Sequence, residues 1–279
     1  MARAHPETIS PTAHYTGYVW FAHGQSHEAF ATPQGKVMYH ALRATTVIAQ
    51  AAGWPSLEGM LLARHRLIDL RLAELIDSGR VAQVIEVAAG LSPRGWRFRK
   101  KYGDRLRYLE ADLPEMIAHK RSILTELGAG AADTVEIDAL ADTGPATIDA
   151  ICASLDPTKG TAIITEGLVN YFDEPTLRAM WHRFAAALAR FPVGFYLSDL
   201  VLREGNAGAL VASFSQLLAM FVRGKVHVHF DTADAAEKAL ADCGLSGVLL
   251  DPRDFAPALP GLELAGAGRV RIIEAMVES

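Results

Sequence analysis

Short apolar runs alternate with amphipathic stretches along most of the chain. The runs are rich in Val, Ile, Leu and aromatic residues and are bounded by turn-forming or acidic residues, which is typical of buried β-strands. We expect strands at residues 81–90, 105–112, 134–138, 161–167, 193–200, 247–251 and 268–278. The last two runs are expected to form the antiparallel edge of the sheet.

Apolar residues recur at helical spacing in the segments before and between these runs. Helices are predicted at residues 33–52, 57–78, 93–102, 143–155, 174–190 and 233–242, and a further helix is predicted to begin at Pro114. This alternation indicates a parallel, doubly wound sheet, because parallel strands need crossover connections and both sheet faces must be covered. The predicted fold is therefore a single α/β domain with a Rossmann-like, mainly parallel seven-stranded sheet and helices on both faces.

Two segments depart from this rhythm. Residues 1–30 mix aromatic residues and histidines without a regular period, whereas residues 203–230 form a helical stretch rich in Met, Phe and Leu. We expect the first segment to act as a lid and the second to be an insertion over the active face. The expected organisation is an N-terminal helical lid or substrate cap (1–78), a Rossmann-like core (79–202 and 231–279) and this substrate-side insertion.

Composition and charge narrow the class of protein. Hydrophobic residues make up 50% of the 279 positions, which is enough to bury a large core. The formal net charge of -5 gives no broad positive field, so binding to nucleic acid is not expected. The 2 cysteines exclude a disulfide framework, and no run reaches the roughly 18 apolar residues of a membrane span. We expect a cytoplasmic protein with no membrane segment.

Acidic residues occur within or at the end of four successive predicted strands. Glu86 lies within the first strand, and Asp112, Asp138 and Glu166 end the next three. Ligands of open α/β sheets bind at the carboxyl ends of the strands, where a carboxylate after the second strand can accept hydrogen bonds from both ribose hydroxyls of an adenosine. The first turn, residues 88–90, is small but lacks the glycine-rich pattern that a pyrophosphate needs, which disfavours a NAD-dependent oxidoreductase.

Three consecutive segments carry a family resemblance. QVIEVAAGLSPRGWRF, RYLEADLPEMIAHKRSIL and AIITEGLVNYFDEPTLRAM resemble signatures of the leucine carboxyl methyltransferase family, which includes protein carboxyl methyltransferases and polyketide O-methyltransferases. The resemblance implies the class I methyltransferase fold with S-adenosylmethionine (SAM) as cofactor. Within this family we expect methyl transfer to a carboxylate or hydroxyl oxygen of a small molecule, in secondary metabolism, because a compact chain with an aromatic lid and no basic patch suits a small acceptor. A protein C-terminus ranks lower as the acceptor.

The resemblance also implies a set of cofactor-binding residues. Arg64 would pair with the methionyl carboxylate, Asp112 would bind the ribose, and Glu166 would lie near the methionyl amine. Glu86 and Gly90 would contact the methionyl part, while Asp138 and Ala139 would meet the adenine. The complete implied set is Arg64, Glu86, Ala88, Gly90, Asp112, Leu113, Asp138, Ala139, Glu166 and Gly167.

The acceptor side of the site is less sharply indicated. Tyr171 and Asn170 are the candidates for positioning the acceptor in catalysis. Candidate substrate-binding residues are Tyr15, Tyr18, Trp20, His23, Phe214 and Phe221. A carboxylate acceptor needs no general base, whereas a phenol or thiol would benefit from His14, His23 or His27.

Alternatives remain open at several positions. Ser92 and Pro93 stand where the family commonly has an acid and a threonine, and Asn170 replaces a usually apolar residue. These departures keep an inactive binding protein of the same fold in consideration. A methyltransferase acting on sulfur or nitrogen also stays open, because its SAM site would look the same, and so does a homodimer, because the two helices before the sheet could form its contact. His227 and His229 have no third ligand in the sequence pattern, so no metal is expected.

Overall fold

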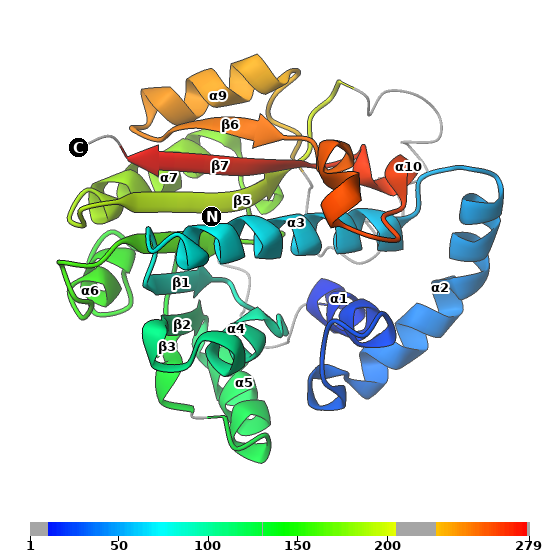
Figure 1. The fold of residues 1–279 in the computed structure, drawn as a ribbon, viewed down its shortest axis with the longest axis horizontal. Helices are drawn as coiled ribbons and strands as arrows, with labels where there is room; N and C mark the ends of the chain where they lie inside the picture. Colours follow the sequence, from blue (N-terminus) through cyan, green and yellow to red (C-terminus); the bar gives the residue numbers. More distant parts are fainter. Residues whose placement is uncertain (1–10, 130, 205–226, 278–279) are drawn as a thin grey trace, which may run out of the picture.

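The computed structural model describes residues 11–129, 131–204 and 227–277. Its centre is a seven-stranded sheet in the order β3-β2-β1-β4-β5-β7-β6, in which only β7 runs antiparallel to its neighbours (Figure 1). The strands are β1 (Gln83–Val87), β2 (Arg107–Asp112), β3 (Thr134–Glu136), β4 (Thr161–Thr165), β5 (Gly194–Leu200), β6 (Ser246–Leu250) and β7 (Arg271–Val277). The predicted mainly parallel sheet with an antiparallel edge is confirmed.

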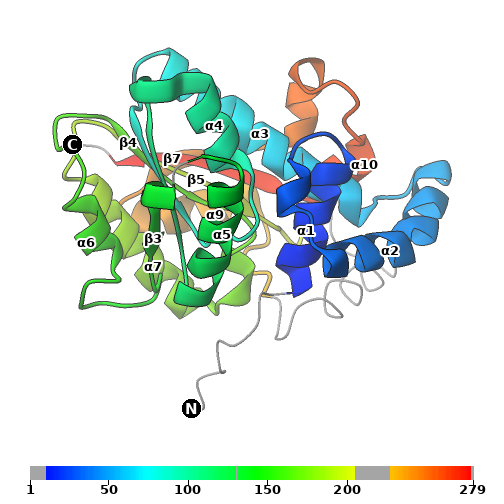
Figure 2. The same ribbon diagram turned by 90° about the horizontal axis from the view of Figure 1, so that it is seen from below.

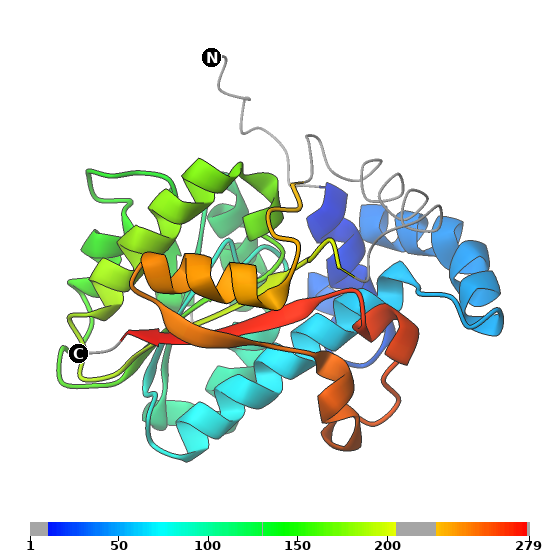
Figure 3. The same ribbon diagram turned by 90° about the horizontal axis from the view of Figure 1, so that it is seen from above.

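Helices cover both faces of this sheet. They are α1 (Pro11–Ala22), α2 (Pro33–Ala51), α3 (Leu57–Asp77), α4 (Arg94–Tyr102), α5 (Pro114–Glu126), α6 (Ile148–Cys152), α7 (Glu174–Leu188), α9 (Ala233–Asp242) and α10 (Leu264–Ala267). Figure 3 shows α9 and α3 on opposite sides of β7. No helix among these combines the length and hydropathy that crossing a bilayer requires.

The alternation of side chains along each strand separates the core into two layers. On one face, Ile85 and Ile163 pack with Trp181 of α7. On the other face, Val84 packs with Leu67 of α3. Glu86 follows Val84 by two positions, so it points toward α3 and α4, although it is buried and charged.

Helices α1 and α2 lie together at one end of the molecule, beyond the sheet (Figure 2). Their close approach depends on Gly35, where a Cβ would lie 2.1 Å from the carbonyl oxygen of His14. Helix α3 is fixed to the last third of the chain at its start. There Glu263 accepts hydrogen bonds from the Ser56 amide at 2.8 Å and from the Ser56 hydroxyl at 2.6 Å.

The structure corrects several sequence-based boundaries. Residues 11–22 form a regular helix rather than the irregular segment expected. The pattern gave no sign of it, because the buried residues spread around more than half of the helix and leave no narrow apolar stripe; they are Tyr15, Thr16, Gly17, Val19 and Trp20. Helix α6 is much shorter than the predicted 143–155 and begins only after its N-cap, Thr147. The insertion expected at 203–230 falls largely on residues 205–226, outside the described residues, as do Phe214 and Phe221.

Strand β3 is also shorter than predicted. It ends at Glu136, and Asp138 follows in a turn in which its amide donates to the carbonyl of Ala146 at 2.9 Å. Asp138 therefore does not terminate a strand. It lies two residues beyond the end of β3, still on the same side of the sheet as the other strand-end acids.

Candidate functional site

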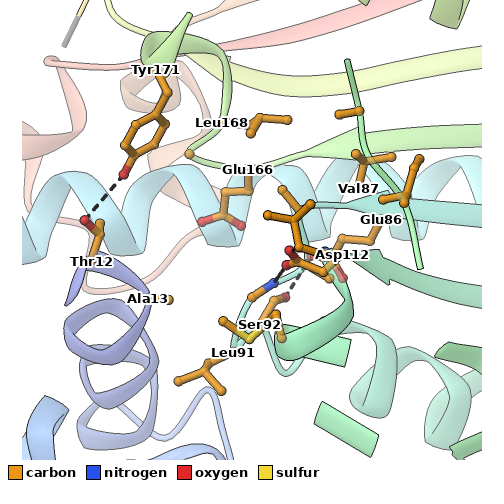
Figure 4. A pocket seen from close by; sticks show the side chains of 18 of the residues that line it. Thr12, Ala13, Glu86, Val87, Leu91, Ser92, Asp112, Glu166, Leu168 and Tyr171 are labelled. Carbon is orange, nitrogen blue, oxygen red and sulfur yellow. Dashed lines mark hydrogen bonds between the residues drawn. The ribbon is translucent and has the colours of Figure 1, made fainter. Parts of the chain in front are cut away.

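A cavity of about 480 Å³ opens at the carboxyl ends of the parallel strands (Figure 4). Its volume suits a small organic ligand, and its place is where open α/β sheets bind ligands. The sheet side is lined by residues 86–92, Asp112, Leu113, 137–140 and 166–168. Helix α1 supplies the opposite wall with Thr12, Ala13, Thr16 and Trp20.

The first loop of the cavity bends sharply after β1. Ala88 has a φ of 55° and Gly90 a φ of 46°, so both residues adopt the left-handed conformation, which is strained for alanine. The Gly90 amide donates to one oxygen of Asp112 at 2.7 Å, and the Leu113 amide donates to the other at 2.7 Å. Burial raises the pKa of Asp112, although these two amides oppose the effect. Each carboxylate oxygen keeps a second acceptor position for a ligand hydroxyl.

Arg64 reaches the cavity from α3 and is held by two acids. Its Nε donates to Glu166 at 3.0 Å and its Nη1 donates to Asp199 at 3.2 Å. Asp199 also accepts the Gly167 amide at 2.6 Å, so it ties the guanidinium to the loop after β4. The sequence reasoning missed Asp199, although it is a fifth acid near the end of a predicted strand.

Arg94 lies behind Glu86 and Glu166 of the cavity lining and is completely buried among three carboxylates. Its guanidinium donates to Asp69 at 2.5 Å, to Glu86 at 2.6 Å and to Glu166 at 2.5 Å. Burial alone would lower the pKa of Arg94, but the carboxylates around it raise that pKa well above its ordinary value. The guanidinium therefore stays charged and neutralises the acids that border the cavity.

Glu86 borders the cavity, but its described hydrogen bonds are with protein side chains behind the cavity lining or in the first loop. Besides Arg94, the hydroxyls of Ser92 and Tyr108 each donate to its carboxylate at 2.8 Å. Ser92 thus has a defined partner, which accounts for one of the two departures from the family pattern in the first turn. Glu86 borders the cavity with its carboxylate already surrounded by protein donors.

His65 completes the network as a neutral side chain. Its Nδ1 lies 2.8 Å from Glu166 and 3.0 Å from Nη2 of Arg94, and its Nε2 lies 2.8 Å from a donor nitrogen of Arg97. We assign the imidazole proton to Nδ1, because the carboxylate is its closer partner and Nε2 faces only a donor at hydrogen-bond distance. Burial lowers the pKa of His65, in agreement with the neutral form. Its ring packs against Trp20, with centroids 4.4 Å apart, so the network also fixes an aromatic side chain of the cavity wall.

The network predicts an acid-dependent loss of stability through Glu166. Burial would raise the pKa of this carboxyl, but the hydrogen bond from His65 and the charges of Arg94 and Arg64 hold it far below its ordinary value. A lowered folded pKa stabilises the fold above the unfolded pKa, and this contribution is lost as the pH falls below about 4.3. Urea unfolding of wild type and Glu166→Gln should therefore give a constant difference in free energy between pH 7 and about pH 5, and this difference should shrink as the pH falls below about 4.3. A difference that stays constant between about pH 5 and about pH 3 would contradict the assignment.

The structure brings all of the predicted cofactor-binding residues to one cavity. Arg64, Glu86, Ala88, Gly90, Asp112, Leu113, Asp138, Ala139, Glu166 and Gly167 all line the cavity. Asp138 accepts the Leu140 amide at 2.9 Å, and this contact holds the loop after β3, the edge strand of the sheet.

The predicted acceptor residues separate into two groups. Trp20 and Tyr171 line the cavity, and the Tyr171 hydroxyl donates to Thr12 at 3.4 Å, linking the loop after β4 to α1 (Figure 4). Asn170 does not line the cavity, because its side-chain amide donates to the His227 carbonyl at 2.6 Å while its own carbonyl accepts the His227 amide.

Three further candidates lie outside the cavity lining. Tyr15 is buried in the core beside α3, Tyr18 packs against aromatic rings of α1 and α2, and His23 lies 2.6 Å from Glu58. His14 is bonded to Thr32, and His27 accepts the Ala29 amide. None of the histidines proposed as a general base contributes to the lining.

Comparison with known proteins assigns the chain to a family. The family model for leucine carboxyl methyltransferase matches residues 19–185, which include Arg64, Asp112 and Glu166. The chain belongs to the leucine carboxyl methyltransferase family. Ser92, one of the residues that depart from the family pattern, lies inside the matched region and donates a hydrogen bond to Glu86.

Two curated relatives in this family are each named "Putative S-adenosyl-L-methionine-dependent methyltransferase". One, from Mycolicibacterium gilvum, is 38% identical over 114 residues, covering 40% of this chain and 35% of the relative. The other, from Rhodococcus jostii, is 32% identical over 151 residues, covering 48% of this chain and 50% of the relative. The chain thus spans about a third to a half of the length of these relatives.

Solved structures establish the fold of this family member. A DUF574 family protein from Streptomyces avermitilis superimposes with a TM-score of 0.64 at 15% identity, covering 96% of this chain and 97% of that chain. A protein from Thermobifida fusca described as a "putative methyltransferase" also has a TM-score of 0.64, at 12% identity, covering 98% and 97%. The similarity extends over nearly the whole of each chain, and the fold is that of class I methyltransferases.

Proposed function

We propose that this protein is an SAM-dependent methyltransferase that acts on a carboxylate or hydroxyl oxygen of a small molecule. The observation that carries the proposal is Asp112, held at the end of β2 by the amides of Gly90 and Leu113 inside a cavity of ligand size. Membership of the leucine carboxyl methyltransferase family and the names of the relatives support the same cofactor.

The described residues suit the parts of that cofactor. Asp112 would accept the two ribose hydroxyls, and Asp138 with the Ala139 amide would meet the adenine. Arg64 has five N–H donors and uses two in its hydrogen bonds with Glu166 and Asp199, so donors remain for the methionyl carboxylate. Glu166 would lie near the methionyl amine.

The bound cofactor supplies an electrophilic methyl group, so the protein has to align the acceptor and exclude water. Thr12, Thr16 and Trp20 of α1 and Tyr171 enclose the cavity on the acceptor side. Within the described part of the lining there is no histidine, lysine or cysteine. An acceptor that is already ionised, such as a carboxylate, needs no base from these residues.

A two-step experiment tests the proposal. Calorimetric titration with S-adenosylhomocysteine (SAH) should give micromolar binding, about 8 kcal/mol, to the purified protein. SAM should then be turned over with a panel of carboxylic acids, phenols, thiols and amines, with SAH formation measured by mass spectrometry. Turnover only with thiols or amines would show that sulfur or nitrogen, and not oxygen, is the methyl acceptor. Cofactor binding without any turnover would favour a binding protein.

The same titration tests a glycine of the site. Gly167 has a φ of 69°, and a Cβ there would lie 2.9 Å from Nη2 of Arg64. Gly128 has a φ of 62° with nothing near its Cβ position, so it matches the backbone strain without the contact. Gly167→Ala should weaken SAH binding about tenfold because Arg64 is displaced, whereas Gly128→Ala should leave it unchanged. Equal affinities of the two variants would contradict this role of Gly167.

A further inference from the structure

A second buried cation lies under the first loop of the cavity. Lys120 of α5 is completely buried, and its Nζ lies 2.6 Å from Oε1 of Glu110 on β2. The ammonium also donates to the carbonyl oxygen of Ala89 at 3.2 Å. Lys120 does not line the cavity, so it can act on a ligand there only through the residues that it holds.

The contact with Glu110 alone does not explain a buried lysine. Glu110 is also paired with Arg99 of α4 and fits against Gly95, where a Cβ would lie 2.5 Å from its carboxyl carbon. Burying an ammonium is expensive, and an apolar side chain of similar volume is often at least as stabilising. The contact that an apolar side chain cannot replace is the one with the carbonyl of Ala89.

Ala89 is the central residue of the strained loop. It stands between Ala88 and Gly90, the two residues in the left-handed conformation, and its amide donates to the Ala111 carbonyl at 3.2 Å. Strained backbone persists only when the surrounding structure holds it. The Ala89 carbonyl accepts hydrogen bonds from the Lys120 ammonium and from the Ser92 amide at 2.9 Å, so Lys120 is its side-chain partner from outside the loop. The next amide in the chain is the one that donates to Asp112.

We propose that Lys120 is a positioning residue for cofactor binding, which fixes the Ala89 carbonyl and thereby directs the Gly90 amide at Asp112. The inference rests on the proposed function and assigns a task to a residue outside the cavity. The positive charge of Lys120 also favours the ionised form of Asp112, against the effect of burial on the pKa of that carboxyl.

The test compares three variants with wild type. Lys120→Met keeps the length of the side chain and removes the ammonium. Glu110→Gln combined with Lys120→Met removes both charges of this pair, so the double variant separates the loss of the Ala89 contact from an excess negative charge at Glu110. Lys238→Met is the matched control, because Lys238 is an exposed lysine that pairs with Asp242.

We expect SAH to bind about tenfold more weakly to Lys120→Met and to the double variant, which corresponds to the loss of one charge-assisted hydrogen bond. The KM for SAM should rise by a similar factor, with kcat at saturating cofactor little changed. Amide hydrogen exchange of a peptide that contains residues 88–92 should become faster in both variants without any ligand. Lys238→Met should behave as wild type in all three measurements.

Three outcomes would overturn the inference. Wild-type affinity in a folded Lys120→Met would remove any role of the ammonium, and wild-type affinity in the double variant would reduce Lys120 to a counter-ion of Glu110. Unchanged hydrogen exchange of the loop in both variants would separate Lys120 from Ala89. Absence of SAH binding to wild type is a different result, because it would remove the proposed function and with it the basis of this inference.

Discussion

Replacing Asp112 with alanine is expected to weaken SAH binding by about 100- to 1,000-fold, the loss of two hydrogen bonds to a charged acceptor. The carboxylate has a double task, because it orders the Gly90 and Leu113 amides and would accept both ribose hydroxyls. Asp112→Asn should be nearly as severe, since its amide nitrogen would face a backbone N–H. Calorimetric titration measures both variants.

A neighbouring acid provides the control for Asp112. Glu136 is the register partner of Asp112 on β3, is exposed and does not line the cavity. Glu136→Gln removes one negative charge close to the same strand ends and should change the affinity less than twofold, as is usual for exposed charges. Comparable losses in Glu136→Gln and Asp112→Ala would mean that general electrostatics, and not the ribose contact, governs binding.

Replacing Arg94 with methionine is expected to lower the free energy of unfolding by about 3–5 kcal/mol, because it leaves buried carboxylates without their cation. Asp69, Glu86 and Glu166 all depend on this guanidinium. The variant should also bind SAH more weakly, since Glu166 would turn toward Arg64. Urea unfolding followed by circular dichroism measures the stability.

An exposed arginine provides the comparison for Arg94. Arg203 pairs with Asp231 at 2.8 Å, and both side chains are more than half exposed. Arg203→Met should cost less than about 1 kcal/mol, because solvent screens such a pair. A loss below about 1 kcal/mol in Arg94→Met as well would show that the buried acids are protonated or hydrated in the folded protein, in conflict with the network described above.

The sequence was sufficient for most of the sheet and its helices. Strands and amphipathic helices have distinct periods, and the predicted helix at 233–242 has the same bounds as α9. Helix α1 was missed because it is buried on several sides, and a helix without a polar face carries no periodic signal. The short helical turns of residues 252–267 were missed as well, since pieces of this length are too brief for a period to be read.

For the site, the positions of the acids were predictable but their partners were not. The carboxyl ends of parallel strands meet at one edge, so Asp112 and Glu166 could be brought together from their place in the pattern. Arg64 and Asp199 are 135 residues apart in the chain, and no local pattern indicates which guanidinium faces which acid. Asn170 illustrates the same limit, because its partner His227 lies in a distant loop.

The two hydrogen bonds from Ser56 to Glu263, here called the clamp, mark a point at which the N-terminal region could be divided during evolution. Helix α3, which carries Arg64 and packs on the sheet, is anchored by this clamp. Besides the connection at residues 52–56, α1 and α2 meet α3 through side chains that contact Glu58 and His65. A recombination crossover in that connection would exchange the cavity wall contributed by α1 and leave the predicted cofactor-binding residues with the host, provided that the incoming segment also contacts Glu58 and His65. The acceptor range of such enzymes could thus diversify by transplanting about fifty residues, a length typical of small exchangeable modules.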